Sequence, residues 1–520
     1  MKAKKPVLIA VLALLLALAL TLPASAREAP HSEELPLGKP GLSETRQSQR
    51  LASGVEYTRI ERGENSGKDF YTVDVSFESE RRDAAQTARK LRREGYDPRV
   101  ETVSERAPDA PESGPLGYLV RTGSFEREAG ANALAKRLEA DGYSEPSVVY
   151  TGEDGAKTTG PWVVHALEID PHRYGGELEP ELATGVVPGR ERLSSIAERE
   201  DSLAAVNGGY FVIEDKDGTP GDLAGIAMLD GELVSEAVDG RTNLLLPEGS
   251  GEEAEIASVS DAITAHSSDG ASREVDGKNR EPGLIRNCGG AGGDEPTERP
   301  KHDFTCTDGS ELIHFTPLFG KSTEPGEGAE VVLDDSGRVV TLRNERGGPI
   351  PEDGSVLSGT GEAADWLRAH AKVGSQLRIE EEVLAGGAPL PEGTTGVVGG
   401  GPRLLRNGQV GILAYEEGFH RPGEPEFYYR FGVRRNPRTL AGVTPEGNLL
   451  LVAVDGRKPG YSVGASFAES AQIMRALGAE EAVNLDGGGS TSMTLGDDLV
   501  NRPSDPTGER PVGDAILLTR

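Results

Sequence analysis

The chain has 520 residues, a formal net charge of −31 and only two cysteines. This length leaves room for two or three domains. The acidic balance argues against nucleic acid as a partner, because proteins that bind a phosphate backbone need a basic surface that releases counterions. An anionic substrate would therefore require a locally basic cleft or bridging divalent cations.

The first 26 residues have the layout of a signal peptide: a basic start, an apolar stretch from Val7 to Leu22 and a small-residue cleavage pattern at Ala24-Ser25-Ala26. A retained anchor is the alternative, but this stretch is shorter than the about 20 residues of a spanning helix. We therefore expect a secreted protein, extracellular or associated with the cell wall, with no stable membrane span after cleavage. Residues 27–68 are poor in large apolar residues and are predicted to form a disordered linker.

Residues 69–152 contain an internal duplication. Apolar alternation after Tyr71 and again after Tyr118 predicts a strand, and alanine and leucine at helical spacing follow in each copy. A second tyrosine, Tyr96 or Tyr143, comes 25 residues after the first one in both copies. Each copy is therefore predicted to be a βαβ unit.

The paired units resemble the sporulation-related repeat (SPOR) domain, in which two such units form one sheet. The second copy has the Gly-Ser-Phe of that family at Gly123-Ser124-Phe125, whereas the first copy, with Val75-Ser76-Phe77, lacks the glycine. The resemblance implies that residues 69–152 bind peptidoglycan glycan strands. A purely structural two-repeat domain is the alternative.

Residues 155–520 are predicted to form a catalytic domain of α+β class, with mixed β-sheets and packed helices. His165 falls in a predicted strand that starts at Trp162, and we interpret it as a structural histidine. Amphipathic spacing predicts a helix over 466–477, and we also expect a helix over 363–370. Around 236–310 the composition is polar and glycine-rich, so we expect insertions there, with a lid as one role for them.

Glycine-rich turns follow several predicted strands of this domain. Glycine has no Cβ, so the backbone at such a turn can approach a ligand closely, although any one of the turns can equally be a plain connection. The segments are, in chain order, Asn207 to Phe211, Val398 to Gly408, Pro437-Arg438-Thr439 leading to Asp455-Gly456-Arg457, Asn484 to Met493, and Asp505 to Val512.

This series of segments resembles the phosphodiester glycosidase family. The resemblance implies hydrolysis of a glycosyl-1-phosphodiester, of the N-acetylglucosamine-1-phosphodiester type, between the anomeric carbon and the phosphate oxygen. Asp486 is the first candidate for the catalytic carboxylate, Asp455 the second, and Glu469 on the preceding helix the third. The implied substrate-binding residues are Asn207, Gly208, Gly209, Gly400, Gly401, Arg438, Arg457, Asn484, Gly487, Gly488, Gly489, Ser490, Thr491 and Arg510.

The arginines of this set suit a phosphate, because a guanidinium pairs bidentately with two of its oxygens. A surface ion pair is the ordinary alternative for each arginine. Two other functions stay open for the chain as a whole. One is a non-catalytic protein that binds cell-wall polymers or exopolysaccharide, and the other is a phosphodiesterase that cleaves the P–O bond.

The implied reaction requires no cofactor. The spacing of His and Cys residues does not indicate zinc, the metal ligands are unknown, and a structural Ca²⁺ ion held by Asp-rich stretches is an alternative. Cys288 and Cys306 lie in a stretch rich in Gly, Asp and Glu. In an oxidising exterior they are predicted to form a disulfide, with two free thiols as the alternative.

Overall fold

The structure is a computed structural model that describes residues 34–520 except 156–157, 239, 250, 288–304 and 422. The predicted signal peptide and Cys288 lie outside the described residues. Residues Glu34–Arg520 form one contiguous unit. Its sheets and helices confirm the α+β class that the sequence predicts.

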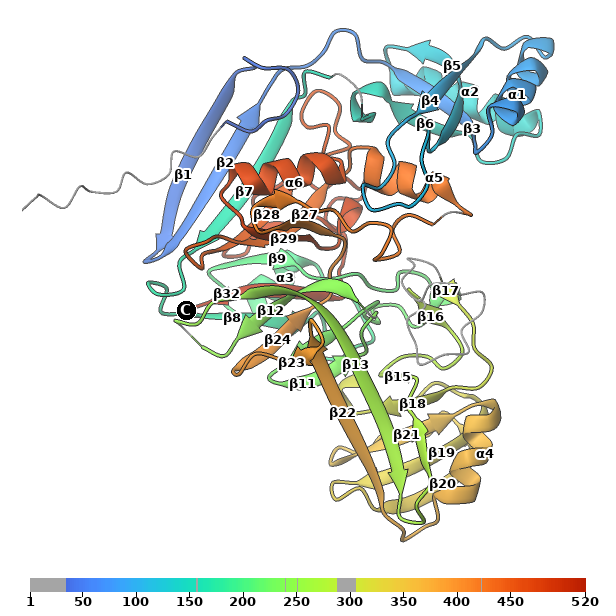
Figure 1. The fold of residues 1–520 in the computed structure, drawn as a ribbon, viewed down its shortest axis with the longest axis vertical. Coiled ribbons are helices and arrows are strands. Elements are labelled where there is room, and N and C mark those ends of the chain that lie inside the picture. The colour runs from blue at the N-terminus through green and yellow to red at the C-terminus, as the bar shows by residue number, and fades with distance from the viewer. Residues whose placement is uncertain (1–33, 156–157, 239, 250, 288–304, 422) are drawn as a thin grey trace, which may run out of the picture. The chain divides into compact units, whose positions relative to one another are not determined.

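The duplicated segment folds as two βαβ units (Figure 1). Their four strands form a sheet in the order β4-β5-β3-β6, which we call the repeat sheet. Alanines and leucines of both helices pack against one face of it, and each helix is followed by a glycine with positive φ, Gly95 or Gly142, as helix C-termini favour. The elements are β3 (Tyr71–Glu78), α1 (Arg81–Arg93), β4 (Pro98–Val103), β5 (Gly117–Phe125), α2 (Glu128–Ala140) and β6 (Ser147–Tyr150).

The other face of the repeat sheet packs against the rest of the chain. Val103 and Leu119 from this face share a hydrophobic cluster with Leu404 and Phe419, and Phe77 stacks on Tyr429 with ring centroids 5.4 Å apart. Tyr429 begins a short π-helical segment, Tyr429–Val433, that follows α5 (Pro425–Tyr428). The repeat units are therefore built into the same body as the residues that follow them.

The prediction of a disordered linker over 27–68 is wrong for its described part. Two strands form a hairpin there and pair with β7, so they extend an eight-stranded sheet that we call the central sheet. Val55 and Tyr57 are buried in one core cluster and Ile60 in another, so both faces of β2 are partly covered. The charged residues between them obscure the strand pattern in the sequence. The central sheet runs β1 (Glu44–Ala52), β2 (Val55–Arg62), β7 (Trp162–Ile169), β28 (Leu449–Val454), β27 (Arg438–Val443), β29 (Glu481–Asn484), β25 (Arg403–Arg406) and β26 (Gln409–Val410).

The expectation of insertions around 236–310 is also wrong in part. Residues of this stretch supply two inner strands of a second large sheet, and alternate residues Val259, Ile263 and Ala265 of β13 are buried in its core. β13 and β22 extend from this sheet toward the sheet that α4 covers (Figure 1). The second sheet contains β11 (Glu232–Ser235), β10 (Ala227–Leu229), β24 (Thr394–Val398), β12 (Arg241–Pro247), β13 (Glu255–Ser267), β22 (Leu377–Ala385) and β23 (Ala388–Pro389), with β14 (Ser272–Glu274) paired to β13.

Two five-stranded sheets and one hairpin complete the strands. One sheet carries helix α4 (Gly361–His370) and comprises β15 (Gly277–Lys278), β18 (Leu312–Phe315), β21 (Gly354–Gly359), β19 (Gly326–Asp334) and β20 (Val339–Arg346). The other comprises β31 (Asp498–Leu499), β30 (Met493–Leu495), β9 (Ala204–Asn207), β32 (Asp514–Thr519) and β8 (Glu177–Leu182), with α3 (Leu193–Arg199) beside it. The hairpin pairs β16 (Ile285–Arg286) with β17 (Thr305–Cys306).

Helix α6 (Phe467–Ala476) confirms the amphipathic helix predicted over 466–477. Phe467, Ile473 and Met474 are buried, and the hydroxyl of Ser466 caps the first turn by accepting from the N–H of Glu469. No helix among the described residues is both long and apolar enough to cross a bilayer. Cys306 is buried on β17, and its disulfide with Cys288 stays a prediction because that partner is not described.

Candidate active site

Three glycine-rich turns meet where β9, β24 and β29 end. The N–H of Asp486, after β29, donates to the carbonyl of Gly208, after β9, at 3.3 Å. The N–H of Gly401, after β24, donates to the carbonyl of Asn484 at 2.8 Å. A Cβ on Gly209 would lie 2.7 Å from the carbonyl oxygen of Gly399, so this approach of two backbones requires glycine. The fold thus brings together segments that are far apart in the sequence.

Asn207 holds two of these turns in place. Its Oδ1 accepts from the hydroxyl of Thr439 at 2.6 Å and from the N–H of Ser492 at 3.1 Å. Its Nδ2 donates to the carbonyl of Asp486 at 2.9 Å. The side chain is buried, and both its oxygen and its nitrogen form hydrogen bonds. It therefore holds the backbone of Asp486 in position.

Asn484 supports the third turn in the same way. Its Nδ2 donates to the hydroxyl of Tyr210 at 2.8 Å and to the carbonyl of Gly401 at 3.1 Å, and the tyrosine hydroxyl donates to the same carbonyl. Asn484 is fully buried. The predicted binding residues Asn207 and Asn484 therefore build the site from inside the protein.

Asp486 is half-buried at the end of β29, and its Oδ1 accepts from the N–H of Gly487 at 2.8 Å. A second carboxylate, that of Asp514 at the start of β32, lies buried next to the Gly208 backbone. The N–H of Gly209 donates to its Oδ2 at 3.2 Å. A Cβ on Gly208 would fall 2.3 Å from that carboxylate, so glycine there is what lets Asp514 close in.

The two carboxylates affect each other's ionisation. Burial raises the pKa of Asp514 to about 7, the negative charge of Asp486 raises it further, and the N–H of Gly209 opposes the shift. Neighbouring carboxylates do not ionise independently, and burial disfavours the charge on the enclosed one. Asp514 therefore takes up a proton as the pH falls through about 7, and the more accessible of the two carboxylates is that of Asp486.

The remaining residues of the glycine run support the turn. Gly488 donates its N–H to the carbonyl of Pro437 at 2.9 Å, and a Cβ on Gly489 would lie 2.1 Å from Nη2 of Arg510. Ser490 and Thr491, predicted as donors to the substrate, are buried, and their hydroxyls have no hydrogen-bond partner among the described residues. Their place inside the protein fits support of the turn better than contact with a sugar.

The three predicted arginines occupy different environments. Arg438 is fully buried with its guanidinium over the rings of Phe467 and Phe431, at 4.4 and 5.1 Å, and its Nε donates to the carbonyl of Ala465. Burial lowers its pKa to about 9. The prediction that Arg438 meets the substrate does not fit this enclosure, which sequence spacing could not reveal.

Arg457 and Arg510 flank the glycine run at its surface. Arg457 is exposed, has a positive φ of 53°, and donates from Nε and Nη2 to Oδ1 of Asn436 at 3.2 and 2.7 Å. Its guanidinium lies 3.4 Å from the place of a Cβ on Gly488. Arg510 pairs with Asp505 at 2.8 Å. Of the three arginines, Arg457 is therefore the best placed for an anion near Asp486.

Two predicted catalytic carboxylates are engaged elsewhere. Asp455 is fully buried, and its oxygens meet Nε2 of His165 at 3.2 Å, the hydroxyl of Tyr461 at 3.0 Å and the N–H of Arg502 at 2.7 Å. His165 also meets the hydroxyl of Tyr57 at 2.7 Å, which fits its interpretation as structural. This enclosure makes Asp455 a positioning residue.

Glu469 has a structural environment too. It completes the cap of α6 by accepting from the N–H of Ser466, and it accepts from Arg435 at 2.7 Å. Arg435 in turn donates to the carbonyls of Gly152 and Asp154 in the segment after the repeat sheet. Glu469 therefore holds this segment in place. The position of Glu469 in the sequence did not indicate this role. The described residues contain no group of three or more His, Cys, Asp or Glu side chains that could hold a metal ion.

Comparisons with known proteins identify two regions of the chain. The sequence model of the phosphodiester glycosidase family matches residues 327–519, which contain Asp455, Asp486 and Asp514. Residues 327–519 therefore match a phosphodiester glycosidase domain. The SPOR domain matches residues 67–150, so the family domain and the repeat sheet lie in one chain.

Two curated relatives are N-acetylglucosamine-1-phosphodiester alpha-N-acetylglucosaminidases. The chain is 30% identical to the Mus musculus protein over 162 residues, and this alignment covers 30% of each chain. It is 33% identical to the Bos taurus protein over 127 residues, covering 24% of this chain and 23% of that protein. The match thus spans less than a third of the length of these relatives.

Solved structures match much more of the chain. A Burkholderia pseudomallei protein described as exported is 36% identical, with a TM-score of 0.86, and the match covers 94% of this chain and 98% of that one. A hypothetical protein from Synechocystis has a TM-score of 0.54 at 20% identity, covering 92% and 76% of the two chains, and shares the fold alone. The body formed by repeat units and phosphodiester glycosidase domain therefore recurs outside this protein.

Sequence reasoning missed Asp514 and Tyr210 in this candidate site. Tyr210 stands inside the Asn207 to Phe211 segment, so its hydroxyl could have been considered. Asp514 opens an apolar strand without any motif around it. Only the pairing of β32 with β9, which sets Ala515 opposite Asn207, brings it to the site.

Proposed function

We propose that this protein hydrolyses glycosyl-1-phosphodiesters of the N-acetylglucosamine-1-phosphodiester type, breaking the bond between the sugar C1 and the phosphate oxygen. The observation that carries the proposal is the half-buried Asp486 carboxylate on a turn of glycines, next to the buried Asp514 whose pKa is raised to about 7. The match of residues 327–519 to the phosphodiester glycosidase family supports the reaction class.

The chemistry of the substrate suits this arrangement. A phosphate monoester is already a good leaving group, so strong acid assistance matters less than stabilisation of the positive charge that develops at C1. Asp486 supplies a fixed negative charge for that centre, and Arg457 supplies a cation for the phosphate. Water provides the oxygen that remains on the sugar, and the phosphate leaves as a monoester.

The test is the release of free N-acetylglucosamine from UDP-N-acetylglucosamine, or from a simpler N-acetylglucosamine-1-phosphodiester, by the wild type and by Asp486→Asn. Release by the wild type alone supports both the reaction and the role of Asp486. Equal release by both proteins contradicts the assignment of Asp486. Release by neither favours a different sugar phosphate or the alternative of a non-catalytic protein that binds wall polymers.

Labelled water separates the two bond cleavages. Hydrolysis in ¹⁸O-water puts the label on the sugar if the C1–O bond breaks, and on the phosphate if the P–O bond breaks. Label on the phosphate would replace the glycosidase proposal by a phosphodiesterase.

We further propose that the protein is secreted and is held at the cell wall through its SPOR domain. The family match supports this role, and the relative described as exported agrees with it. Because the helix-free face of the repeat sheet packs against the protein's own chain, glycan would have to bind at the helices or at the sheet edge. Co-sedimentation of the full chain with purified peptidoglycan, with and without stem peptides, tests this part.

A further inference from the structure

A cavity of about 400 Å³ lies where the repeat units meet the glycosidase domain. This size is within the usual range of small-molecule sites. Its walls come from both sides of that junction. They include Tyr71, Tyr150 and Glu153 on the repeat side and Arg434, Asn436 and Arg457 on the other.

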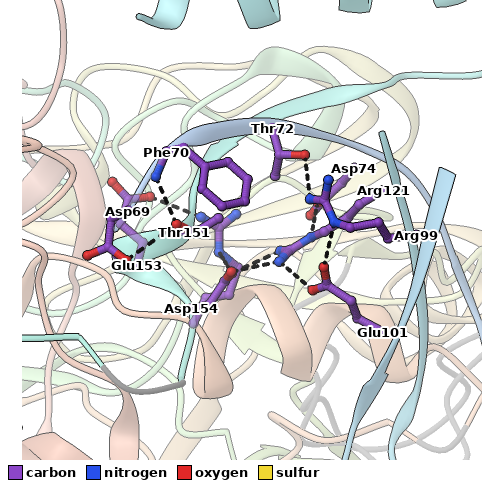
Figure 2. A network of polar contacts seen from close by, with 12 residues as sticks. Asp69, Phe70, Thr72, Asp74, Arg99, Glu101, Arg121, Thr151, Glu153 and Asp154 are labelled. Carbon is purple, nitrogen blue, oxygen red and sulfur yellow. Dashed lines mark hydrogen bonds and ion pairs between the residues drawn. The ribbon is translucent and has the colours of Figure 1, made fainter. Parts of the chain in front are cut away.

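A network of polar contacts centred on Arg121 joins the two sides of the junction (Figure 2). Arg121 on β5 is buried and donates to Asp74 at 2.6 Å, to Asp154 at 2.6 and 2.9 Å, and to the hydroxyl of Tyr429 at 2.8 Å. Asp154 directly follows Glu153, so this network fixes the segment that brings Glu153 to the cavity.

The guanidinium groups of Arg457 and Arg434 have different partners in the cavity. Arg457 donates only to the neutral Asn436, and no ion pair of the described residues includes it. Arg434 donates from Nη2 to Glu153 at 3.0 Å, and its buried Nε lies 3.8 Å from Oδ1 of Asp154. Arg457 is therefore the one of these two guanidinium groups that lacks an acidic partner among the described residues. In a chain with a net charge of −31, this is a place where an anion would complete the pairing.

The cavity adjoins the catalytic turn through Arg457. The guanidinium of Arg457 lies against Gly488, two residues beyond Asp486, and Asn436 precedes the Pro437 whose carbonyl accepts from Gly488. A phosphate bound by Arg457 therefore lies between the cavity and Asp486.

We propose that this cavity is the leaving-group subsite, in which Arg457 and Arg434 bind the phosphate of the substrate and Tyr71 and Tyr150 contact its alcohol part. This inference rests on the proposed function. In this proposal the repeat units form one wall of the substrate site. They therefore determine which phosphate monoester fits as the leaving group. The two tyrosine rings are neighbours, with centroids 5.1 Å apart, and suit a planar or apolar alcohol.

Glu153 makes the affinity for an anion depend on pH. Burial raises its pKa to about 7, Arg434 and Arg457 oppose the shift, and Asp154 and Glu128 add to it. Below pH 7 the protonated carboxyl no longer neutralises Arg434 and no longer repels an anion. Anions are therefore expected to bind more tightly as the pH falls through this range.

Calorimetric titration with sulfate tests the site apart from catalysis, because the charge of sulfate is constant between pH 6 and 8. Arg434→Gln should weaken sulfate binding about tenfold, which corresponds to about 1.4 kcal/mol. Glu153→Gln should tighten binding at pH 8 and abolish its pH dependence, a gain that misfolding cannot produce. The control is Arg378→Gln, on exposed β22 and outside the cavity, which should bind as the wild type does.

Unchanged sulfate affinity in both Arg434→Gln and Glu153→Gln overturns the subsite. If the sulfate pattern appears but no substrate is hydrolysed, the anion site stands and the proposed reaction fails. The alcohol contact has its own readout. Tyr71→Ala should raise KM for UDP-N-acetylglucosamine and leave KM for a methyl phosphodiester of N-acetylglucosamine unchanged, and an equal effect on both substrates contradicts the role of Tyr71.

Discussion

Two buried groups of charges in this protein are arranged in opposite ways. Around Arg121, five donated hydrogen bonds reach Asp74, Glu101, Asp154 and Tyr429, so cation and carboxylates compensate each other. Around Asp486 and Asp514, two carboxylates share a site, and the N–H groups of Gly487 and Gly209 donate to them. In this protein, carboxylates that are paired with a cation mark a structural junction. Two neighbouring carboxylates that repel each other mark a candidate site for chemistry.

Removal of the Arg121 guanidinium should have the largest effect. Arg121→Met leaves Asp74 and Asp154 without their cation, and breaking a buried pair on one side costs about 3–5 kcal/mol. Urea unfolding should show a loss of this size. Arg457→Gln, which removes an exposed arginine without an acidic partner among the described residues, should stay within about 0.5 kcal/mol of the wild type. Equal losses in the two variants would contradict the contrast between the regions.

Asp486→Asn should have the next largest effect. It should lower activity and leave stability unchanged. The change keeps the shape of the side chain and removes its charge, so kcat should fall about 10²–10³-fold, as for other preorganised charges that stabilise a transition state. The unfolding midpoint should remain that of the wild type. A variant that loses stability and activity together would place Asp486 among the structural carboxylates.

Asp514→Asn should have a smaller effect, and the pH profile should reveal it. An amide resembles the protonated Asp514, so activity at pH 6 should stay within about tenfold of the wild type. Wild-type activity should fall above pH 7, where ionised Asp514 places a second charge beside Asp486, and the variant should lack this fall.

The pH dependence of stability gives an independent check of the raised pKa of Asp514. The pKa of folded Asp514 is above its unfolded value, so the folded state binds more protons between about pH 4 and 7. Its contribution is full at low pH and is lost as the pH rises through 7. The melting temperature of the wild type should therefore drop more between pH 6 and 8 than that of Asp514→Asn. Parallel curves would show that Asp514 has an ordinary pKa.

Removal of divalent cations by a chelator should have the smallest effect on activity. The described residues contain no cluster of three metal-ligating side chains, and the proposed charges come from Asp486 and Arg457. Activity after dialysis against EDTA should stay within twofold. A loss that Ca²⁺ restores would instead support a structural calcium ion.

Local patterns in the sequence predicted the parts of the fold that depend on local structure. The repeat helices, α6 and the glycine turns follow from periodicity and from the conformational freedom of glycine. The strands at 44–62 and 241–267 were missed because their burial depends on distant partners such as β7 and β22. The same limit applies to the site: Asp455, Asp486 and Asp514 are all acidic residues beside strands, and only tertiary packing separates the accessible one from the enclosed ones.

The pairing of β2 with β7 has a consequence for how the chain reaches its native state. The hairpin of β1 and β2 precedes the repeat units, whereas its partner β7 follows them, and the bond between Tyr57 and His165 joins residues 108 positions apart. Contacts so distant in sequence form slowly, while the βαβ units are local. During synthesis the repeat units can therefore fold first. Their folding brings the β1–β2 hairpin, which precedes them, close to the edge of β7, which follows them.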